Sequence, residues 1–291
     1  MLKDITIGQY IPSDSWVHRL DPRVKLIISM LYIFMVFKIK ALWGFVPMAL
    51  ALLFVVYLAK LPLKYLLKGL KPLRMILLIT FLVNLLMTPG EPLVYKALGF
   101  ITISKDGLGK AVYMCFRLSF LIVGTSILTL TTSPIALTEA IENLLGPLKK
   151  IGIPIHEFAM MMTIALRFIP TLMEEADKIM KAQSARGADF ESGNIISRAK
   201  NMVPLLVPMF LISFHRAEEL GIAMESRCYR GDQGRTRLNP LHYAGKDAVA
   251  VLGVLLFFGA LLAVQAYEAR RQSQIYKVEV RYYLVAWLDE R

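Results

Sequence analysis

Two long apolar runs without a charged side chain constrain this sequence more than any other feature. They cover residues 41–59 and 248–266. As helices, both are long enough to cross most of a bilayer core of about 30 Å. The chain is 56% hydrophobic, with a mean hydropathy of +0.53, but 19% of its residues are charged. We therefore expect a membrane protein with a sizeable part in water.

Three further runs complete the predicted membrane part. We expect an N-terminal membrane bundle over residues 1–132, with spans near 24–40, 41–59, 72–88 and 111–132. A last span is expected over 246–267. The first run is short, so lysine and arginine side chains at its ends must reach the headgroups. Asp21 followed by Pro22 predicts the start of its helix.

Charge sets the expected orientation. The formal net charge is +12, and the most basic loop of the first half contains Lys60, Lys64, Lys68, Lys71 and Arg74. Such loops lie in the cytoplasm. Four spans then return the chain to the side of its N-terminus, so both the N-terminus and the residues after 132 are predicted to be cytoplasmic.

Two details of the bundle can also be predicted. Residues 100–104 favour a short extended piece, and Lys105, Asp106 and Gly107 favour a turn, both on the outer face. Arg117 lies about 9 Å into the fourth span if that span begins near residue 111. We interpret it as paired inside the bundle, rather than as part of a transport path.

Residues 133–245 form a predicted cytosolic module with helices near 134–145, 155–185 and 195–229. The helix over 155–185 could be mistaken for a span. Its apolar part is short and contains Pro170, and its second half is charged, so we interpret it as amphipathic. The tail, 268–291, cannot be assigned: a strand, an interfacial helix and disorder all remain open.

One stretch of this module, residues 182–190, holds Arg186 between the small residues Ala185 and Gly187. A looser echo at residues 225–231 places Arg227 between Ser226 and Cys228. Small neighbours let another surface approach, and a guanidinium offers five donors to carboxylates or carbonyls. Two docking tips are one interpretation. Ordinary helix C-termini, where Arg and Gly are favoured, are the other.

The motifs of catalysis and of self-powered transport are missing from the sequence. No phosphate-binding loop occurs, and the four histidines, His18, His156, His215 and His242, do not form a zinc-protease motif. No basic run with interleaved aromatic residues suggests nucleic-acid binding. The two cysteines, Cys115 and Cys228, are not expected to pair. We expect neither an enzyme nor a bound cofactor or metal, but a part that transmits force made elsewhere.

Three segments resemble the transmembrane T component of energy-coupling factor (ECF) transporters, the EcfT/CbiQ family. They are residues 15–26 (SWVHRLDPRVKL), residues 165–170 (ALRFIP) leading to Glu174 and Glu175, and residues 182–188 (AQSARGA). The last looks like the family's first Ala-Arg-Gly coupling motif. The second motif should also read close to Ala-Arg-Gly, but Ser226-Arg227-Cys228 keeps only the arginine.

The resemblance implies an all-α integral membrane protein of about five transmembrane helices, with long cytosolic coupling helices. It implies two ABC-type ATPase subunits as partners, which bind ATP and Mg²⁺, and a membrane-embedded S component that captures a vitamin or metal ion. The coupling residues would be Ala185, Arg186, Gly187, Ser226, Arg227 and Cys228. Contacts to the S component would come from Ile135, Leu137, Ile141, Leu144, Met160, Met161 and Ile164.

Three other functions stay open at this point. The chain could be the substrate-contacting permease of a conventional ABC importer, a stand-alone secondary transporter, or an intramembrane enzyme. The last two lack the broken spans with polar midpoints, or the catalytic pairs, that they would need. The resemblance places the chain in the cell membrane of a prokaryote and leaves the substrate unidentified, because that choice belongs to the S component.

Overall fold

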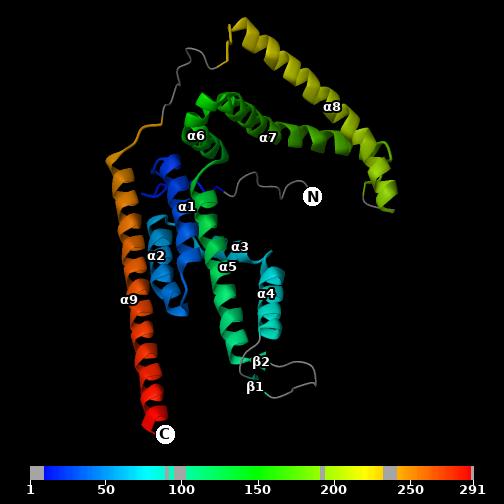
Figure 1. Ribbon diagram of the computed structural model, residues 1–291. Helices are drawn as coiled ribbons and strands as arrows, with labels where there is room; N and C mark the ends of the chain where they lie inside the picture. The colour runs from blue at the N-terminus through cyan, green and yellow to red at the C-terminus, as the bar shows by residue number, and fades with distance from the viewer. Residues whose placement is uncertain (1–9, 89–91, 95–102, 191–193, 232–240, 290–291) are drawn as a thin grey trace. The chain divides into compact units, whose positions relative to one another are not determined.

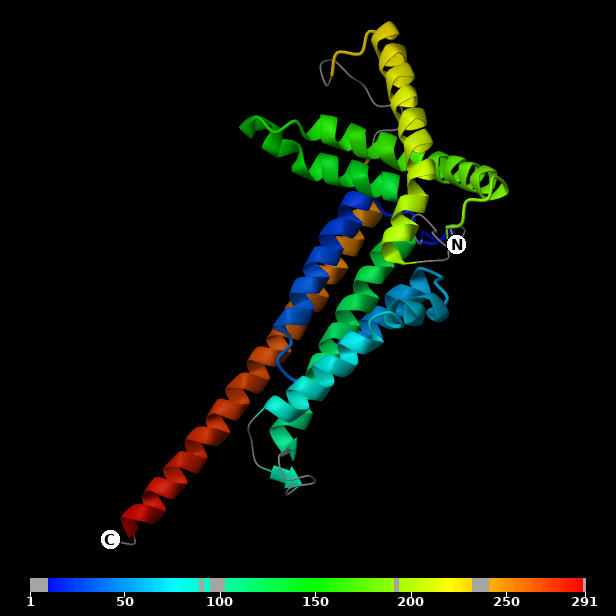
Figure 2. The same ribbon diagram turned by 90° about the vertical axis from the view of Figure 1, so that its right-hand side faces the viewer.

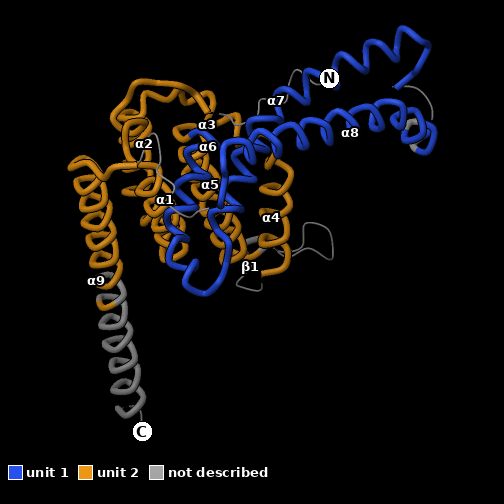
Figure 3. Tube along the Cα trace, turned by 90° about the horizontal axis from the view of Figure 1, so that it is seen from above, with its two compact units in different colours: residues 1–9, 133–240 blue, residues 10–132, 241–291 orange. Residues whose placement is uncertain are grey.

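The computed structural model describes residues 10–88, 92–94, 103–190, 194–231 and 241–289. These residues are almost wholly helical, apart from one small two-stranded sheet (Figure 1). The all-α class predicted from the sequence is therefore confirmed. The chain divides into two compact units (Figure 3). Unit 1 comprises residues 1–9 and 133–240, and unit 2 comprises residues 10–132 and 241–291.

Unit 2 is built around one central helix, α5, which packs against four other helices of the unit (Figure 1). A further helix, α9, lies along α1. The elements of this unit are α1 (Pro22–Lys38), the 3-10 turn η2 (Leu42–Gly44), α2 (Phe45–Leu58), α3 (Leu63–Leu70), α4 (Arg74–Met87), α5 (Lys105–Thr131) and α9 (Gly245–Asp289).

Two apolar clusters form the core of unit 2. One gathers side chains of the N-terminal segment, α2, α3 and α5, including Val17, Val56 and Leu130. The other joins α1, α2 and α9 through residues such as Met35 and Leu261. Large apolar side chains also cover the outside; Trp43 and Tyr57 are both 80% exposed. Such an outer surface suits lipid rather than water.

Local sequence signals set several helix starts. The Asp21 side chain caps α1 by accepting the Arg23 N–H at 2.8 Å, with Pro22 at the first position. Ser133 and Pro134 start the helix α6 (Pro134–Leu145) in the same way. Both pairs combine a capping oxygen with a residue whose fixed φ suits a helix and whose missing N–H costs nothing there.

The third predicted span agrees with the structure, whereas the fourth begins earlier than expected. The span predicted over 72–88 corresponds to α4, which begins at Arg74; the basic segment before it forms a separate helix, α3, and the two helices meet at a break with a 58° bend. The fourth helix begins at Lys105, so the predicted turn over 105–107 is wrong. The reason is a cap: the Ser104 hydroxyl accepts the Gly107 N–H at 2.9 Å. Of the predicted extended piece, Ile103–Ser104 forms a strand (β2) antiparallel to β1 (Pro92–Val94), and 100–102 lie outside the described residues.

By length and apolar composition, three described helices suit a membrane span: α5, α7 (Ile155–Ala185) of unit 1, and residues Gly245–Tyr267 of α9. The bent pair of α3 and α4 would be a fourth. The predicted total of five relies on α1 and α2, which have only 17 and 14 residues. It also leaves out α7, because the charged residues of that helix gather in its second half.

The unassigned tail is helical. α9 continues without a break from Gly245 to Asp289, a total of 45 residues. At 1.5 Å per residue this helix is about 67 Å long, twice the length needed to cross a bilayer core. Of the three alternatives left open for residues 268–291, the structure has a helix as far as 289.

Arg117 is paired inside the bundle, which confirms the structural interpretation. Its guanidinium donates to the Ile39 carbonyl at 3.0 Å and also contacts the Tyr113 hydroxyl. The same group lies 4.6 Å from the centre of the Tyr113 ring and 5.8 Å from that of Phe37. Because Ile39 is the C-cap of α1, the cation sits at a helix C-terminus, where the peptide dipoles stabilise positive charge.

Candidate functional site

The described residues of unit 1 form three helices and one 3-10 segment. They are α6 (Pro134–Leu145), η3 (Gly146–Ile151), α7 (Ile155–Ala185) and α8 (Ile195–Ser226). The first two helices match the predicted ranges, whereas α8 ends three residues before the predicted 229. α6 packs on α7, and α7 on α8. The green α7 and the yellow α8 cross each other in two perpendicular views (Figures 1 and 2).

Two polar contacts link these helices. Between α6 and α7, His156 Nδ1 lies 2.8 Å from Glu142 Oε1, and both side chains are largely buried. Between α7 and α8, the Arg216 guanidinium lies 3.4 Å from Glu175 Oε1. Polar contacts are directional, so they fix how the helices are rotated against one another, while the apolar contacts around them provide most of the attraction.

The end of α7 places Arg186 in a defined conformation. Arg186 is the C-cap, and Gly187 follows with φ +90°. The Gly187 N–H donates to the Ser184 carbonyl and the Ala188 N–H to the Gln183 carbonyl, both at 3.0 Å. This pair of bonds is the Schellman motif, which satisfies the last carbonyls of a helix and needs a left-handed residue after the cap.

The end of α8 repeats this geometry around Arg227. Arg227 is again the C-cap, and Cys228 follows with φ +55°. The Cys228 N–H donates to the Glu225 carbonyl at 2.8 Å, and the Tyr229 N–H to the Met224 carbonyl at 3.1 Å. Only Ser226 and Cys228 depart from the expected Ala-Arg-Gly pattern. Their backbone nevertheless presents the arginine from the same helix position as Ala185 and Gly187 do.

Both arginine side chains are exposed, as is Cys228. Within the described part of the chain, neither Arg186 nor Arg227 forms a hydrogen bond or ion pair through its guanidinium. After the first tip, the Asp189 carbonyl accepts a hydrogen bond from the Asn201 side chain at 2.7 Å. That bond ties the loop to the start of α8. The two helix ends can therefore each offer an unused five-donor group to an acidic partner.

The seven residues predicted to contact an S component lie on α6 and α7, but not all of them are accessible. Ile135, Ile141 and Met161 are exposed, whereas Leu137, Leu144, Met160 and Ile164 are partly buried. Ile164 lines a mainly apolar groove of about 230 Å³ between α7 and α8. The other lining residues are Phe168, Leu172, Ser213, Arg216, Ala217, Leu220, Gly221 and Met224.

Sequence reasoning did not assign a role to the apolar stripe of α8. Seven exposed side chains recur in pairs four residues apart along this helix: Met202, Val203, Leu206, Val207, Phe210, Leu211 and Phe214. Residues at this spacing share one face of a helix. The periodic pattern is visible in the sequence, but the run also contains Pro204 and Pro208 and is too short for a clean membrane span, so it was not interpreted as a contact face. An unpartnered stripe of this size suits lipid or another apolar surface.

In the described residues, no group of three or more His, Cys, Asp or Glu side chains gathers as a metal site would require. The polar contacts between α6 and α7 and between α7 and α8 are instead pairwise. The described chain is thus a helical membrane protein in which α7 and α8 end in exposed arginine caps.

Comparison with known proteins agrees with this class. The CbiQ family model, described as cobalt transport protein, matches residues 13–238. The energy-coupling factor transporter transmembrane protein EcfT of Clostridium kluyveri is 55% identical over 257 residues, covering 88% of this chain and 95% of the relative. The EcfT proteins of Ruminiclostridium cellulolyticum and Bacillus subtilis are 49% and 48% identical, over 92% and 89% of this chain and 99% of each relative.

The fold and the comparisons define a transmembrane component of a transporter. More particularly, the chain belongs to the EcfT/CbiQ family, the transmembrane T components of ECF transporters. The resemblance inferred from three sequence segments is confirmed over most of the chain.

Proposed function

We propose that this chain couples ATP hydrolysis by two cytosolic ABC-type ATPase subunits to substrate release by a membrane-embedded S component. The observation that carries the proposal is the repeated geometry of the two tips. Each of the two helices ends in an arginine at its C-cap position, Arg186 in α7 and Arg227 in α8. Two such ends suit two similar grooves on a pair of related subunits. ATP and Mg²⁺ would be bound by those partners, and the S component would supply the vitamin or metal-ion specificity.

The electrostatics of the tips support docking into acidic grooves. A guanidinium pairs with carboxylates through two parallel hydrogen bonds, which are stronger when the groove excludes water. The small residues Ala185, Gly187 and Ser226 leave room for close approach on both sides of each arginine. Removing one such arginine should weaken docking by about 2–5 kcal/mol, because the carboxylate left behind stays buried and unpaired.

The exposed apolar surface supports a second partner within the membrane. Ile135, Ile141 and Met161 on α6 and α7, together with the stripe of α8, present apolar area that no described residue covers. An S component bound against this surface would be moved whenever α7 and α8 move. In this arrangement the N-terminus and unit 1 face the cytoplasm, on the side of the basic loops.

The experiment is a pull-down from detergent-solubilised membranes with the tagged chain as bait. The variant is the double substitution Arg186→Glu, Arg227→Glu, which replaces attraction by repulsion at both tips. Lys200→Glu is the matched control, since it makes the same kind of change at an exposed cation on the side of α8. We expect ATP-hydrolysing subunits to co-purify with the wild type and the control, and to be lost with the double variant.

Each other outcome points elsewhere. If no ATPase binds the wild type, the coupling function fails, and a stand-alone secondary transporter becomes the better hypothesis. If ATPases remain bound to the double variant, the complex is right but the two arginine tips are not the docking contacts. Specific binding of substrate to the purified chain would indicate the permease of a conventional ABC importer.

A further inference from the structure

Buried polar residues of the described chain concentrate in one part of unit 2. Seven polar or charged residues are buried, and all except Ser104 lie in the N-terminal segment, at the start of α1, at the end of α5 or at the start of α9. The six are Ser15, Asp21, Lys25, Thr131, Thr132 and Asp247. Burying charge is costly unless each group is paired, so such a concentration needs a specific arrangement.

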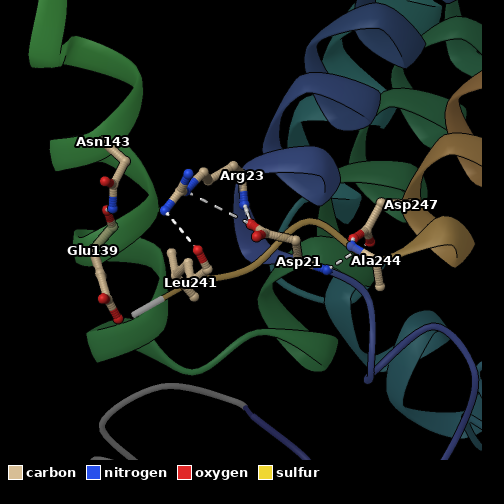
Figure 4. Close-up of polar contacts among 7 residues, drawn as sticks. All are labelled: Asp21, Arg23, Glu139, Asn143, Leu241, Ala244 and Asp247. Atoms are coloured by element: carbon tan, nitrogen blue, oxygen red, sulfur yellow. Dashed lines mark hydrogen bonds and ion pairs between the residues drawn. The ribbon is translucent and has the colours of Figure 1, made fainter. Parts of the chain in front are cut away.

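Asp247 connects the starts of α1 and α9. One carboxylate oxygen accepts the Asp21 N–H at 2.9 Å, and the other accepts the Ala244 N–H at 2.7 Å (Figure 4). The second bond is half of a capping box, in which a side chain in the first turn returns to the backbone just before the helix. The first bond reaches a residue 226 positions away in the sequence. A single carboxylate therefore fixes two helix starts.

Arg23 fastens the chain that leads into α9. Its backbone N–H donates to Asp21 Oδ1 at 2.8 Å, and its guanidinium lies 3.5 Å from the Leu241 carbonyl (Figure 4). The guanidinium also sits over the Tyr243 ring, 5.2 Å from its centre. Residues 241–243 are thus held against the start of α1 by one side chain.

Lys25 fastens the end of α5. Its ammonium group donates to the His18 carbonyl and to the Thr131 carbonyl, both at 3.0 Å. Thr131 is the last residue of α5, and the neighbouring Leu130 carbonyl accepts the Ile11 N–H at 3.0 Å. Two orphan carbonyls of the helix end are satisfied in this way, and a positive charge lies where the helix dipole favours it.

These contacts coincide with the places where the chain leaves and re-enters unit 2. The chain passes to unit 1 after residue 132 and returns at residue 241. We call Asp21, Arg23, Lys25 and Asp247 the polar clamp. Its carboxylates and cations balance in charge, and its contacts hold the last turn of α5, the segment before α9 and the start of α1 together.

We propose that the polar clamp holds the end of α5, the segment that leads into α9 and the start of α1 as one rigid joint within unit 2, so that force arriving through either connection from the coupling module reaches α5, α9 and α1 together. This proposal rests on the proposed coupling function. A purely stabilising role fits the residues less well, because buried ion pairs are often matched or exceeded in stability by apolar packing. Their directional contacts instead fix position, which a joint requires.

The test uses the complete transporter in proteoliposomes, with ATP hydrolysis and substrate uptake measured on the same preparation. The variant is Asp247→Asn. Its side-chain amide has only one accepting oxygen, so it cannot accept both the Asp21 N–H and the Ala244 N–H as the two carboxylate oxygens do. Asp106→Asn is the control, because Asp106 is an exposed carboxylate of the same unit. Arg23→Lys is a milder second variant that keeps the charge but loses the planar group over Tyr243.

We expect both clamp variants to retain their ATPase partners and ATP hydrolysis, while uptake per ATP falls about tenfold for Asp247→Asn, the scale of one lost charge-assisted hydrogen bond. The control should match the wild type. If uptake per ATP is unchanged in both clamp variants, the joint is not needed for coupling and the proposal is overturned.

A second readout does not depend on transport. Hydrogen exchange of the purified chain should show faster exchange in two separate peptides, around Asp21 and around Ala244, for Asp247→Asn alone. If ATPases do not bind the wild type but both peptides still respond, the coupling function has failed while the geometry of the clamp stands. If neither peptide responds, the shared carboxylate contact itself is refuted.

Discussion

Exchanging the residues at the two left-handed positions tests whether α7 and α8 end in the same structure. Gly187 has φ +90° and Cys228 has φ +55°, each directly after an arginine cap. Glycine adopts this region freely, whereas any other residue brings its Cβ close to the following carbonyl. We therefore predict opposite effects: Gly187→Cys should loosen the end of α7, and Cys228→Gly should tighten the end of α8.

The magnitude follows from two opposing terms. A side chain in the left-handed region costs about 1–2 kcal/mol, and the greater freedom of glycine in an opened chain cancels about 0.5–1 kcal/mol of the gain. The net effect on the free energy of local opening is then about 0.5–1 kcal/mol at each tip, or roughly a two- to fivefold change in amide exchange rate. No Cβ clash adds to this at Gly187, because nothing lies within 4 Å of the position its Cβ would take.

The assay is hydrogen exchange followed by mass spectrometry on peptides that cover 183–188 and 224–229. Gly152→Ala serves as a reference, since Gly152 has φ +88° but follows η3 rather than an arginine tip. It should change exchange near residue 152 and leave both tips alone. Faster exchange in Cys228→Gly, or no change in Gly187→Cys, would refute the shared Schellman geometry.

Two further predictions concern unit 2. Replacing Arg117 by Met should lower the apparent melting temperature in detergent by several degrees, because the end of α1 loses a charge-assisted bond worth about 1.5–3 kcal/mol; an unchanged melting temperature would contradict the capping role. Burial lowers the pKa of His18 below its ordinary value of 6.5, while the bond to the Ile11 carbonyl acts in the opposite direction. Below pH 6.5 the His18 imidazole therefore binds a proton more readily in the unfolded chain than in the folded chain. The free energy of unfolding should fall as the pH drops below about 6.5. Comparison with His18→Gln over pH 5–8 should show this loss only in the wild type.

Helix starts were predictable wherever the chain itself carries the capping group. Asp21 and Ser133 precede prolines, and each caps its helix through a side-chain oxygen. Ser104 also caps a helix, but the glycines after it favour a turn by their intrinsic preference. The cap and the packing of α5 against its neighbours outweigh that preference, so the helix begins six residues earlier than expected.

The break between α3 and α4 has a local cause that the sequence contains. The sequence from Leu63 to Met87 is apolar enough to be one bent span, but Pro72 lies inside it, between the two helices. Proline has no N–H to donate and disfavours a helical conformation in the residue before it, so the helix breaks at 71–73. Tertiary packing adds to this, since Leu66 of α3 is buried in the first core cluster and both helices pack on α5. The clamp could not be predicted from local sequence, because Asp21 and Asp247 are far apart in the chain.

The two tips show why a motif written as letters can understate a structural repeat. By sequence, Ser226-Arg227-Cys228 shares only its arginine with Ala185-Arg186-Gly187. In the structure, what repeats is the position of the arginine at the helix cap, because the two backbone bonds of the Schellman motif need a left-handed residue but not a particular side chain. Cysteine can adopt the left-handed conformation at a conformational cost of about 1–2 kcal/mol, which the other contacts of the folded helix can offset. The equivalence of the tips therefore lies in helix termination, and a search for similar helix ends should follow arginine caps rather than the three-letter motif.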